Sequence, residues 1–153
     1  LLRHSPESGN GHRVDVETAA ADLAIEADEA QVRQVVWNLA TNGLRAMPNG
    51  GRLVLGAAPG DNEGSVNLVV ADEGVGIPPE KVESLFQPFQ GTFSRGTGLG
   101  LAIVQRIVSD SGGAIRVRSA PGQGTTITVN LPASAAGDPR ETGMPALAQL
   151  DVR

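Results

Sequence analysis

The residues best suited to chemistry in this chain are two asparagines and an arginine in one predicted helix. Asn38, Asn42 and Arg45 follow one another at i, i+4 and i+7, which places them on one helix face. Amide oxygens are neutral ligands for Mg²⁺, and a guanidinium binds phosphate oxygens. Asparagine pairs on helices are more often solvated or capping, so this pattern alone leaves both interpretations open.

Two glycine clusters supply the features of a phosphate site. Gly96, Gly98 and Gly100 precede a predicted helix, and Gly74 and Gly76 follow a predicted strand. Glycines leave backbone N–H groups uncovered, and a helix N-terminus attracts phosphate oxygens. Glycines also permit tight turns, which is the commoner explanation for an isolated pair. The surrounding residues must therefore decide between a turn and a site.

Two familiar phosphate-binding motifs are excluded. A Walker A loop needs Lys followed by Ser or Thr after its glycines, whereas Leu101 and Ala102 stand there, and Lys81 is the only lysine in the chain. A dinucleotide fingerprint needs a strand immediately before the glycines, and residues 85–94 do not read as one. The glycine clusters belong to some other nucleotide fold.

Asp72 and Thr125 are candidates for recognising a base. At a buried position, the Asp72 carboxylate accepts a hydrogen bond from an adenine amino group, and Gly74 and Gly76 allow the base to approach the backbone. Alone, Asp72 also reads as an ordinary turn residue. Thr125 shares a strand face with three aliphatic residues, so its hydroxyl should point inward and need a polar partner. Asp72 is the predicted partner.

The hydrophobic pattern predicts the elements that position these residues. Asp28 is the predicted N-cap of a long helix that ends at the breaker 47–51, with an apolar stripe of Val32, Val35, Val36, Leu39, Gly43 and Ala46. A second long helix is predicted from about Leu99 to 111–113, with an apolar stripe of Leu99, Ala102, Ile103 and Ile107. A short helix is expected after Pro79. Alternation predicts strands at 12–17, 22–26, 53–57, 66–70, 114–119 and 125–131.

Composition narrows the function classes. The 153 residues suit one domain, and the absence of cysteine excludes disulfides, thiolate metal sites and cysteine nucleophiles. A net charge of −5, without a basic stripe, argues against nucleic acid as a partner. No apolar run is long enough for a membrane helix. Because the chain begins at Leu1, we expect a fragment of a longer protein, with any membrane contact made by its other regions.

In this order the motifs resemble the ATP-binding domain shared by sensor histidine kinases, gyrase-type topoisomerases, ninety-kilodalton heat-shock chaperones and MutL proteins. The matching stretches are an asparagine box (31–46), a first glycine box (72–77), an F box (85–89), a second glycine box (96–102) and a closing segment (122–132). The histidine kinases are the most similar class, and short-lid kinases of nitrogen-regulation or pilus-regulating type are the nearest in character.

The resemblance implies an α+β fold, a two-layer α/β sandwich in which a mixed, mostly antiparallel sheet carries helices on one face. ATP and Mg²⁺ are the implied cofactors, with Asn42 and Asn38 as metal ligands and Asn38, Arg45 and Arg95 as catalytic residues. The implied nucleotide contacts are Asn38, Asn42, Arg45, Asp72, Gly74, Gly76, Ile77, Phe89, Thr92, Arg95, Gly96, Thr97, Gly98, Leu99, Gly100 and Thr125.

Domain boundaries and partners follow from the same resemblance. Residues 1–11 are expected to be a linker from an upstream dimerisation and phosphoacceptor domain, 12–132 the ATP-binding kinase domain, and 133–153 a flexible tail. The implied activity transfers the γ-phosphoryl group to a histidine on that upstream domain, for relay to a response regulator. The full-length protein is expected to be a homodimer, with this domain in the cytoplasm.

Two departures from the family pattern leave alternatives open. Phe93 stands where similar lids carry a lysine, which Arg95 would have to replace, and Gly43 stands where many members have alanine. We expect Gly43 to admit a phosphate or the lid. An anti-sigma-type serine kinase, an ATP-gated conformational module and a non-catalytic pseudokinase remain alternatives. Asn38 disfavours the ATP-gated module, because gyrase-type and chaperone ATPases usually carry at that position a glutamate that activates water.

Overall fold

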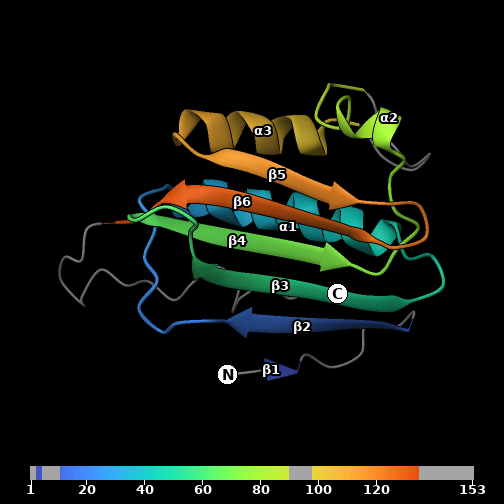
Figure 1. Ribbon diagram of the computed structural model, residues 1–153, viewed down its shortest axis with the longest axis horizontal. Coiled ribbons are helices and arrows are strands. Elements are labelled where there is room, and N and C mark those ends of the chain that lie inside the picture. The colour runs from blue at the N-terminus through green and yellow to red at the C-terminus, as the bar shows by residue number, and fades with distance from the viewer. Residues whose placement is uncertain (1–2, 5–10, 90–97, 135–153) are drawn as a thin grey trace.

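A six-stranded sheet forms the framework of the computed structural model, which describes residues 3–4, 11–89 and 98–134 (Figure 1). The strand order is β1-β2-β3-β4-β6-β5; only the β2–β3 pair is parallel. The strands are β1 (Arg3–His4), β2 (His12–Thr18), β3 (Gly51–Pro59), β4 (Ser65–Asp72), β5 (Ala114–Ser119) and β6 (Thr125–Pro132). The mixed, mostly antiparallel sheet predicted from the motifs is confirmed.

Three helices lie on one face of this sheet: α1 (Glu29–Arg45), α2 (Pro79–Val82) and α3 (Gly100–Asp110). Parallel strands need a crossover connection, and α1 supplies it between β2 and β3. The chain then makes the predicted hairpin of β3 and β4, whose strands pair from Leu53 with Asp72 to Pro59 with Val66. This connectivity places the ends of β4 and β5 beside the helices.

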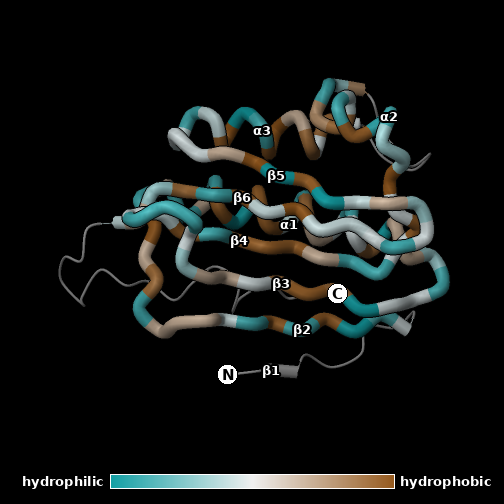
Figure 2. Tube along the Cα trace, viewed as in Figure 1, coloured by the Kyte–Doolittle hydropathy of each residue, from teal (hydrophilic) through white to brown (hydrophobic). Residues whose placement is uncertain are grey.

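The core lies between the sheet and the two long helices. Val35 and Val36 of α1, Val104 of α3 and Leu53 of β3 are all at most 1% exposed. Figure 2 shows hydrophobic stretches along β3 and β4, and Leu53, Leu55, Leu68 and Val70 of these strands belong to the core. Strand β6 alternates buried and half-buried residues along its whole length, as expected for a strand with one covered face.

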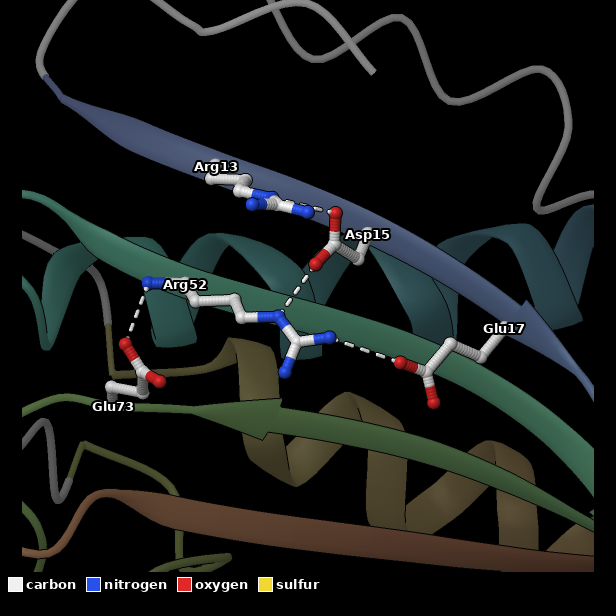
Figure 3. Close-up of polar contacts among 5 residues, drawn as sticks. All are labelled: Arg13, Asp15, Glu17, Arg52 and Glu73. Carbon is white, nitrogen blue, oxygen red and sulfur yellow. Dashed lines mark hydrogen bonds and ion pairs between the residues drawn. The ribbon is translucent and has the colours of Figure 1, made fainter. Parts of the chain in front are cut away.

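The opposite face of the sheet carries an ion-pair network (Figure 3). The buried carboxylate of Asp15 is held by Arg52 at 2.5 Å and Arg13 at 3.0 Å, and Arg52 also reaches Glu17 at 3.1 Å. These two arginines lower the pKa of Asp15 below its ordinary value. The backbone N–H of Arg52 donates to Glu73, which links this network to the loop after β4.

Three local expectations are corrected. Residues 22–26 form no strand; Ile25 makes only an isolated bridge to Ala133, flanked by hydrogen bonds from the Glu26 N–H to the Pro132 carbonyl at 3.0 Å and from the Ser134 N–H to the Ala24 carbonyl at 2.9 Å. The predicted apolar stripe of α3 is rotated, since Ile103 is 36% exposed while Val104 is buried. The segment 3–4, which shows no strand pattern, pairs with β2.

Candidate functional site

The asparagine face of α1 begins from a well-formed N-terminus. The Asp28 carboxylate accepts the backbone N–H of Gln31 at 3.0 Å, the N-cap that the sequence predicts. The apolar stripe at the predicted spacing is buried, which turns Asn38 and Asn42 toward the partly open side of the helix. Both asparagines are half-buried, and Arg45, one turn on, is exposed.

Asn38 connects α1 to α3. Its amide nitrogen donates to the backbone carbonyl of Gly100 at 3.1 Å, the first residue of α3. With the NH₂ group used in this way, the amide oxygen of Asn38 is left as an acceptor or a metal ligand. In the described part of the chain no three His, Cys, Asp or Glu side chains gather to hold a metal. The amide oxygens of Asn38 and Asn42 are of the neutral type that can coordinate Mg²⁺.

Among the described residues no side chain caps the N-terminus of α3, in contrast to that of α1. Its N-cap, Leu99, makes no side-chain hydrogen bond, and no acidic residue lies in the first turn. The first N–H groups of a helix have no partner within it and carry partial positive charge. Gly98, just before the helix, has φ +67°. These uncovered amides can bind an anion such as a phosphate group.

Phe89 and Gly98 lie at the two ends of the predicted lid. The Phe89 N–H donates to the Gly98 carbonyl at 3.1 Å, so these two residues are close in space. Phe89 has φ +64° and is 78% exposed, which excludes a role in the core. The lid residues Thr92, Phe93, Arg95, Gly96 and Thr97 lie outside the described residues.

Asp72 ends β4 with its side chain on the helix-covered side. Its Oδ1 accepts the Gly74 N–H at 2.9 Å. Burial raises the pKa of Asp72, and hydrogen bonds from the backbone N–H groups of Gly74 and Thr125 partly oppose this rise. A partly desolvated carboxylate at a strand end is well placed to accept a hydrogen bond from a ligand.

Gly43 packs against Leu53 and this carboxylate. A Cβ atom at Gly43 would lie 2.7 Å from Leu53 Cδ1, 3.4 Å from Asp72 Cβ and 3.5 Å from Asp72 Oδ2. The prediction that Gly43 admits a phosphate or the lid is therefore not supported. Among the described residues, Gly43 allows α1 to approach the end of β4, where the base is expected.

The first glycine box is clamped between two parts of the fold. Val75 donates to the carbonyl of Ala46 just beyond α1 at 3.0 Å, and it accepts from Gly122 in the β5–β6 turn at 2.7 Å. A Cβ atom at Gly76 would lie 1.9 Å from the carbonyl oxygen of Ala120. Gly76 therefore allows a close approach between this loop and the β5–β6 turn.

Thr125 is buried as predicted, but its hydroxyl partner is Ser119. The two hydroxyl oxygens are 2.8 Å apart, whereas Asp72 is reached by the Thr125 backbone N–H. The Ser119 hydroxyl also accepts the N–H of Ile77 at 2.8 Å. Sequence reasoning missed Ser119. Ser119 alternates with Ile115 and Val117, which places it on the covered face of β5. This alternation in the sequence could have identified Ser119.

The geometry thus combines a helix N-terminus that no described side chain caps, two half-buried asparagines and a half-buried carboxylate. Residues 27–135 match the family described as histidine kinase-, DNA gyrase B- and HSP90-like ATPases. The chain belongs to this family. It is an ATP-binding domain of that family, and the fold class predicted from its motifs agrees with the solved structures that it resembles.

Curated relatives of this family member are histidine kinases. It is 37% identical over 130 residues to sporulation kinase D of Bacillus subtilis, covering 83% of this chain and 25% of the relative. It is 40% identical over 116 residues to the histidine protein kinase DivJ of Caulobacter vibrioides, covering 72% and 19%. The chain therefore spans about a quarter or less of the length of these relatives.

Solved structures give the same assignment. The crystal structure of full-length ShkA in complex with AMPPNP has a TM-score of 0.75 at 34% identity, covering 85% of this chain and 27% of that one. The mycobacterial sensor histidine kinase MprB has a TM-score of 0.69 at 33% identity, covering 78% and 82%. Within the described residues, no helix has the length and apolar character needed to cross a membrane.

Proposed function

We propose that this domain binds ATP with Mg²⁺ and is the catalytic domain of a sensor histidine kinase. It would transfer the γ-phosphoryl group of ATP to a histidine on a separate dimerisation domain, for relay to a response regulator. One observation carries the proposal: the Asn38–Gly100 hydrogen bond joins the asparagine face of α1 to the uncapped N-terminus of α3. Phosphate-binding amides and metal-binding amide oxygens are thereby neighbours.

Each group in this proposal has one task. Asp72 accepts a hydrogen bond from the adenine amino group. Gly74, Gly76 and Ile77 form the wall behind the base. Asn42, helped by Asn38, holds Mg²⁺ against the phosphates. Backbone amides of Gly98, Leu99 and Gly100 bind the phosphate oxygens. The remaining contacts proposed are Phe89, Thr92, Gly96, Thr97 and Thr125.

Phosphoryl transfer depends chiefly on positioning and electrostatics. Arg45 is exposed on the same helix face as the asparagines, and Arg45 and Arg95 would offset negative charge that develops on the transferred group. No dedicated base is required, because a neutral imidazole nitrogen is already nucleophilic. Asn38 is an amide and cannot activate water, which favours transfer to a protein over hydrolysis.

The rest of the protein is part of the same proposal. Residues 1–11 would link to the upstream dimerisation domain, 12–132 form the catalytic domain, and 133–153 form a tail. Of this tail only residues 133 and 134 are described; Ser134 donates its backbone N–H to Ala24 at 2.9 Å. We propose a cytoplasmic domain within a homodimer, whose membrane contact, if any, is made by other regions.

Asn42→Asp tests the site. The new carboxylate would face the phosphates and repel them, so we expect Mg-ATP affinity measured by calorimetry to fall by about tenfold or more. Asn49→Asp is the matched control, because Asn49 is exposed in the turn after α1 and makes the same charge change. Equal affinity of the two variants would contradict the proposed site.

The reaction class needs a separate measurement. The domain is incubated with labelled ATP and a dimerisation domain that carries a phosphoacceptor histidine, and the product is treated with acid. A phosphohistidine is lost in acid and survives alkali, whereas a phosphoserine survives acid. Acid-labile label on the partner supports the histidine kinase. Acid-stable label would indicate the serine-kinase alternative, and Mg-ATP binding without any label would indicate a non-catalytic module.

A further inference from the structure

Three polar side chains stand side by side at one end of the sheet, on the side covered by helices. Asp72 of β4 pairs with Thr125 of β6, and Thr125 pairs with Ser119 of β5. We call these three residues the polar rung. Thr125 is 6% exposed and lies between the other two. The side chain that would bind the base is therefore separated from Ser119 by one buried hydroxyl.

The hydrogen atoms of the polar rung can be assigned from its partners. Ser119 Oγ lies 3.0 Å from the Gly124 carbonyl oxygen, which can only accept. Ser119 has one hydrogen, and this contact uses it. The Ile77 N–H donates to the same Oγ at 2.8 Å. The 2.8 Å contact between Ser119 and Thr125 is then satisfied only when Thr125 is the donor.

The consequence concerns Thr125. With its single hydrogen directed at Ser119, the Thr125 hydroxyl can offer a ligand only lone pairs. The neighbouring Asp72 carboxylate, when ionised, also accepts only. The base-facing end of the polar rung therefore presents two acceptors and no side-chain donor. A purine amino group carries two hydrogens and can donate to both acceptors. A purine carbonyl oxygen has only lone pairs and makes no hydrogen bond with either of them.

We propose that Ser119 is a positioning residue that makes this site select 6-amino over 6-oxo purine nucleotides by holding the Thr125 hydroxyl as an acceptor. This inference rests on the proposed function, because it assumes that the base binds beside Asp72. Ser119 acts through Thr125, and it also fastens the first glycine box through the Ile77 N–H. Removing the Ser119 hydroxyl frees the Thr125 hydrogen to turn and donate to a 6-oxo group.

The experiment compares the affinities of ATP and inosine triphosphate, whose bases differ only by an amino or an oxo group at position 6 and the proton on N1. Calorimetry in the presence of Mg²⁺ gives both dissociation constants for the wild type and for Ser119→Ala. We expect the preference for ATP to fall by about tenfold in Ser119→Ala, since one hydrogen bond changes partner. Ser109→Ala, at an exposed position of α3, should leave the preference unchanged.

A merely structural role of Ser119 gives a different result. If loss of the hydroxyl only loosens the glycine box, both nucleotides weaken in parallel and their ratio stays at the wild-type value, which overturns the inference. Thr125→Val removes the hydroxyl on which Ser119 acts and should itself lower the ratio. In that background Ser119→Ala should have no further effect on the ratio, and a further fall would also overturn the inference.

The outcomes separate this inference from the proposed function. A wild-type domain that binds neither nucleotide refutes both. A wild-type domain that prefers ATP, with an unchanged ratio in Ser119→Ala, refutes only the role of Ser119. If Ser119→Ala does not fold, Ser119→Thr, which keeps a hydroxyl, together with Thr125→Val decides the matter. A wild-type ratio in the first and a lowered ratio in the second support the inference, and any other pair overturns it.

Discussion

Gly124 and Gly122 occupy the same turn between β5 and β6, and substituting each by alanine should have unequal effects. Both have a left-handed backbone, with φ +74° and +75°. A Cβ atom at Gly122 would meet nothing within 4 Å. A Cβ atom at Gly124 would lie 2.0 Å from the carbonyl oxygen of Asp72 and 3.1 Å from Glu73 Cα. The pair therefore separates backbone strain from crowding at the site.

The expected magnitudes follow from these contacts. A left-handed alanine costs about 1–2 kcal/mol, which is the whole expected effect of Gly122→Ala. At Gly124 the crowded atoms belong to the backbone and cannot rotate away, so the ends of β4 and β6 must move apart. Losing one or two backbone hydrogen bonds there adds about 1–3 kcal/mol to the backbone strain, which gives a total of about 2–5 kcal/mol.

Urea unfolding of the two variants measures these costs, and calorimetry with Mg-ATP measures the effect on the site. Gly124→Ala should also weaken ATP binding, because the displaced backbone is that of Asp72, whereas Gly122→Ala should keep nearly wild-type affinity. Equal losses of stability in the two variants would refute the reasoning. So would an unaltered ATP affinity in a Gly124→Ala protein that is clearly destabilised.

Two further predictions concern the carboxylates of Asp72 and Asp15, whose pKa values are shifted in opposite directions. Burial raises the pKa of Asp72, so its charge costs stability once the pH exceeds its folded pKa. Asp72→Asn should therefore unfold at an equal or higher urea concentration than the wild type at pH 7, and this advantage should be lost below the ordinary pKa of 3.8. The same variant should bind ATP poorly. Arginines lower the pKa of Asp15, so the stabilisation by its carboxylate is present above its ordinary pKa and is lost as the pH falls through its pKa in the folded protein. Asp15→Asn should therefore be less stable than the wild type at pH 7 and approach the stability of the wild type in acid. Urea unfolding at both pH values measures this difference.

Local patterns predicted the elements that depend on local physics. The long helix α1, its N-cap at Asp28 and its breaker at 47–51 all follow from spacing and capping within a few residues of one another. The hairpin of β3 and β4 likewise follows from alternation around a turn. The positions of the glycine boxes at the ends of β4 and α3 could also be read from the sequence.

Contacts between distant segments could not be read in the same way. The partner of Thr125 depends on which strand lies beside β6 and on the loop at Ile77 reaching the same hydroxyl. Gly43 was expected to lie beside a phosphate or the lid. The periodicity of α1 predicts which helix face Gly43 occupies, but it does not predict that this face packs against Leu53 and Asp72. The segment 22–26 alternates like a strand, yet its pairing is limited to an isolated bridge between Ile25 and Ala133, a distant contact that local alternation does not predict.

Several locally unfavourable features gather at one end of this domain. The carboxylate of Asp72 is partly desolvated, no described side chain caps the N-terminus of α3, and the exposed Phe89 has a left-handed backbone, each of which costs free energy. In Figure 1 the C-terminal ends of β4 and β5 and helix α2 lie at the same end of the sheet, on the right. The opposite end of α1, by contrast, is closed by Asp28. Because α1 has a side-chain N-cap, the lack of one at α3 is a property of that position. The unsatisfied groups are therefore best explained by a charged, hydrogen-bonding ligand that satisfies them together.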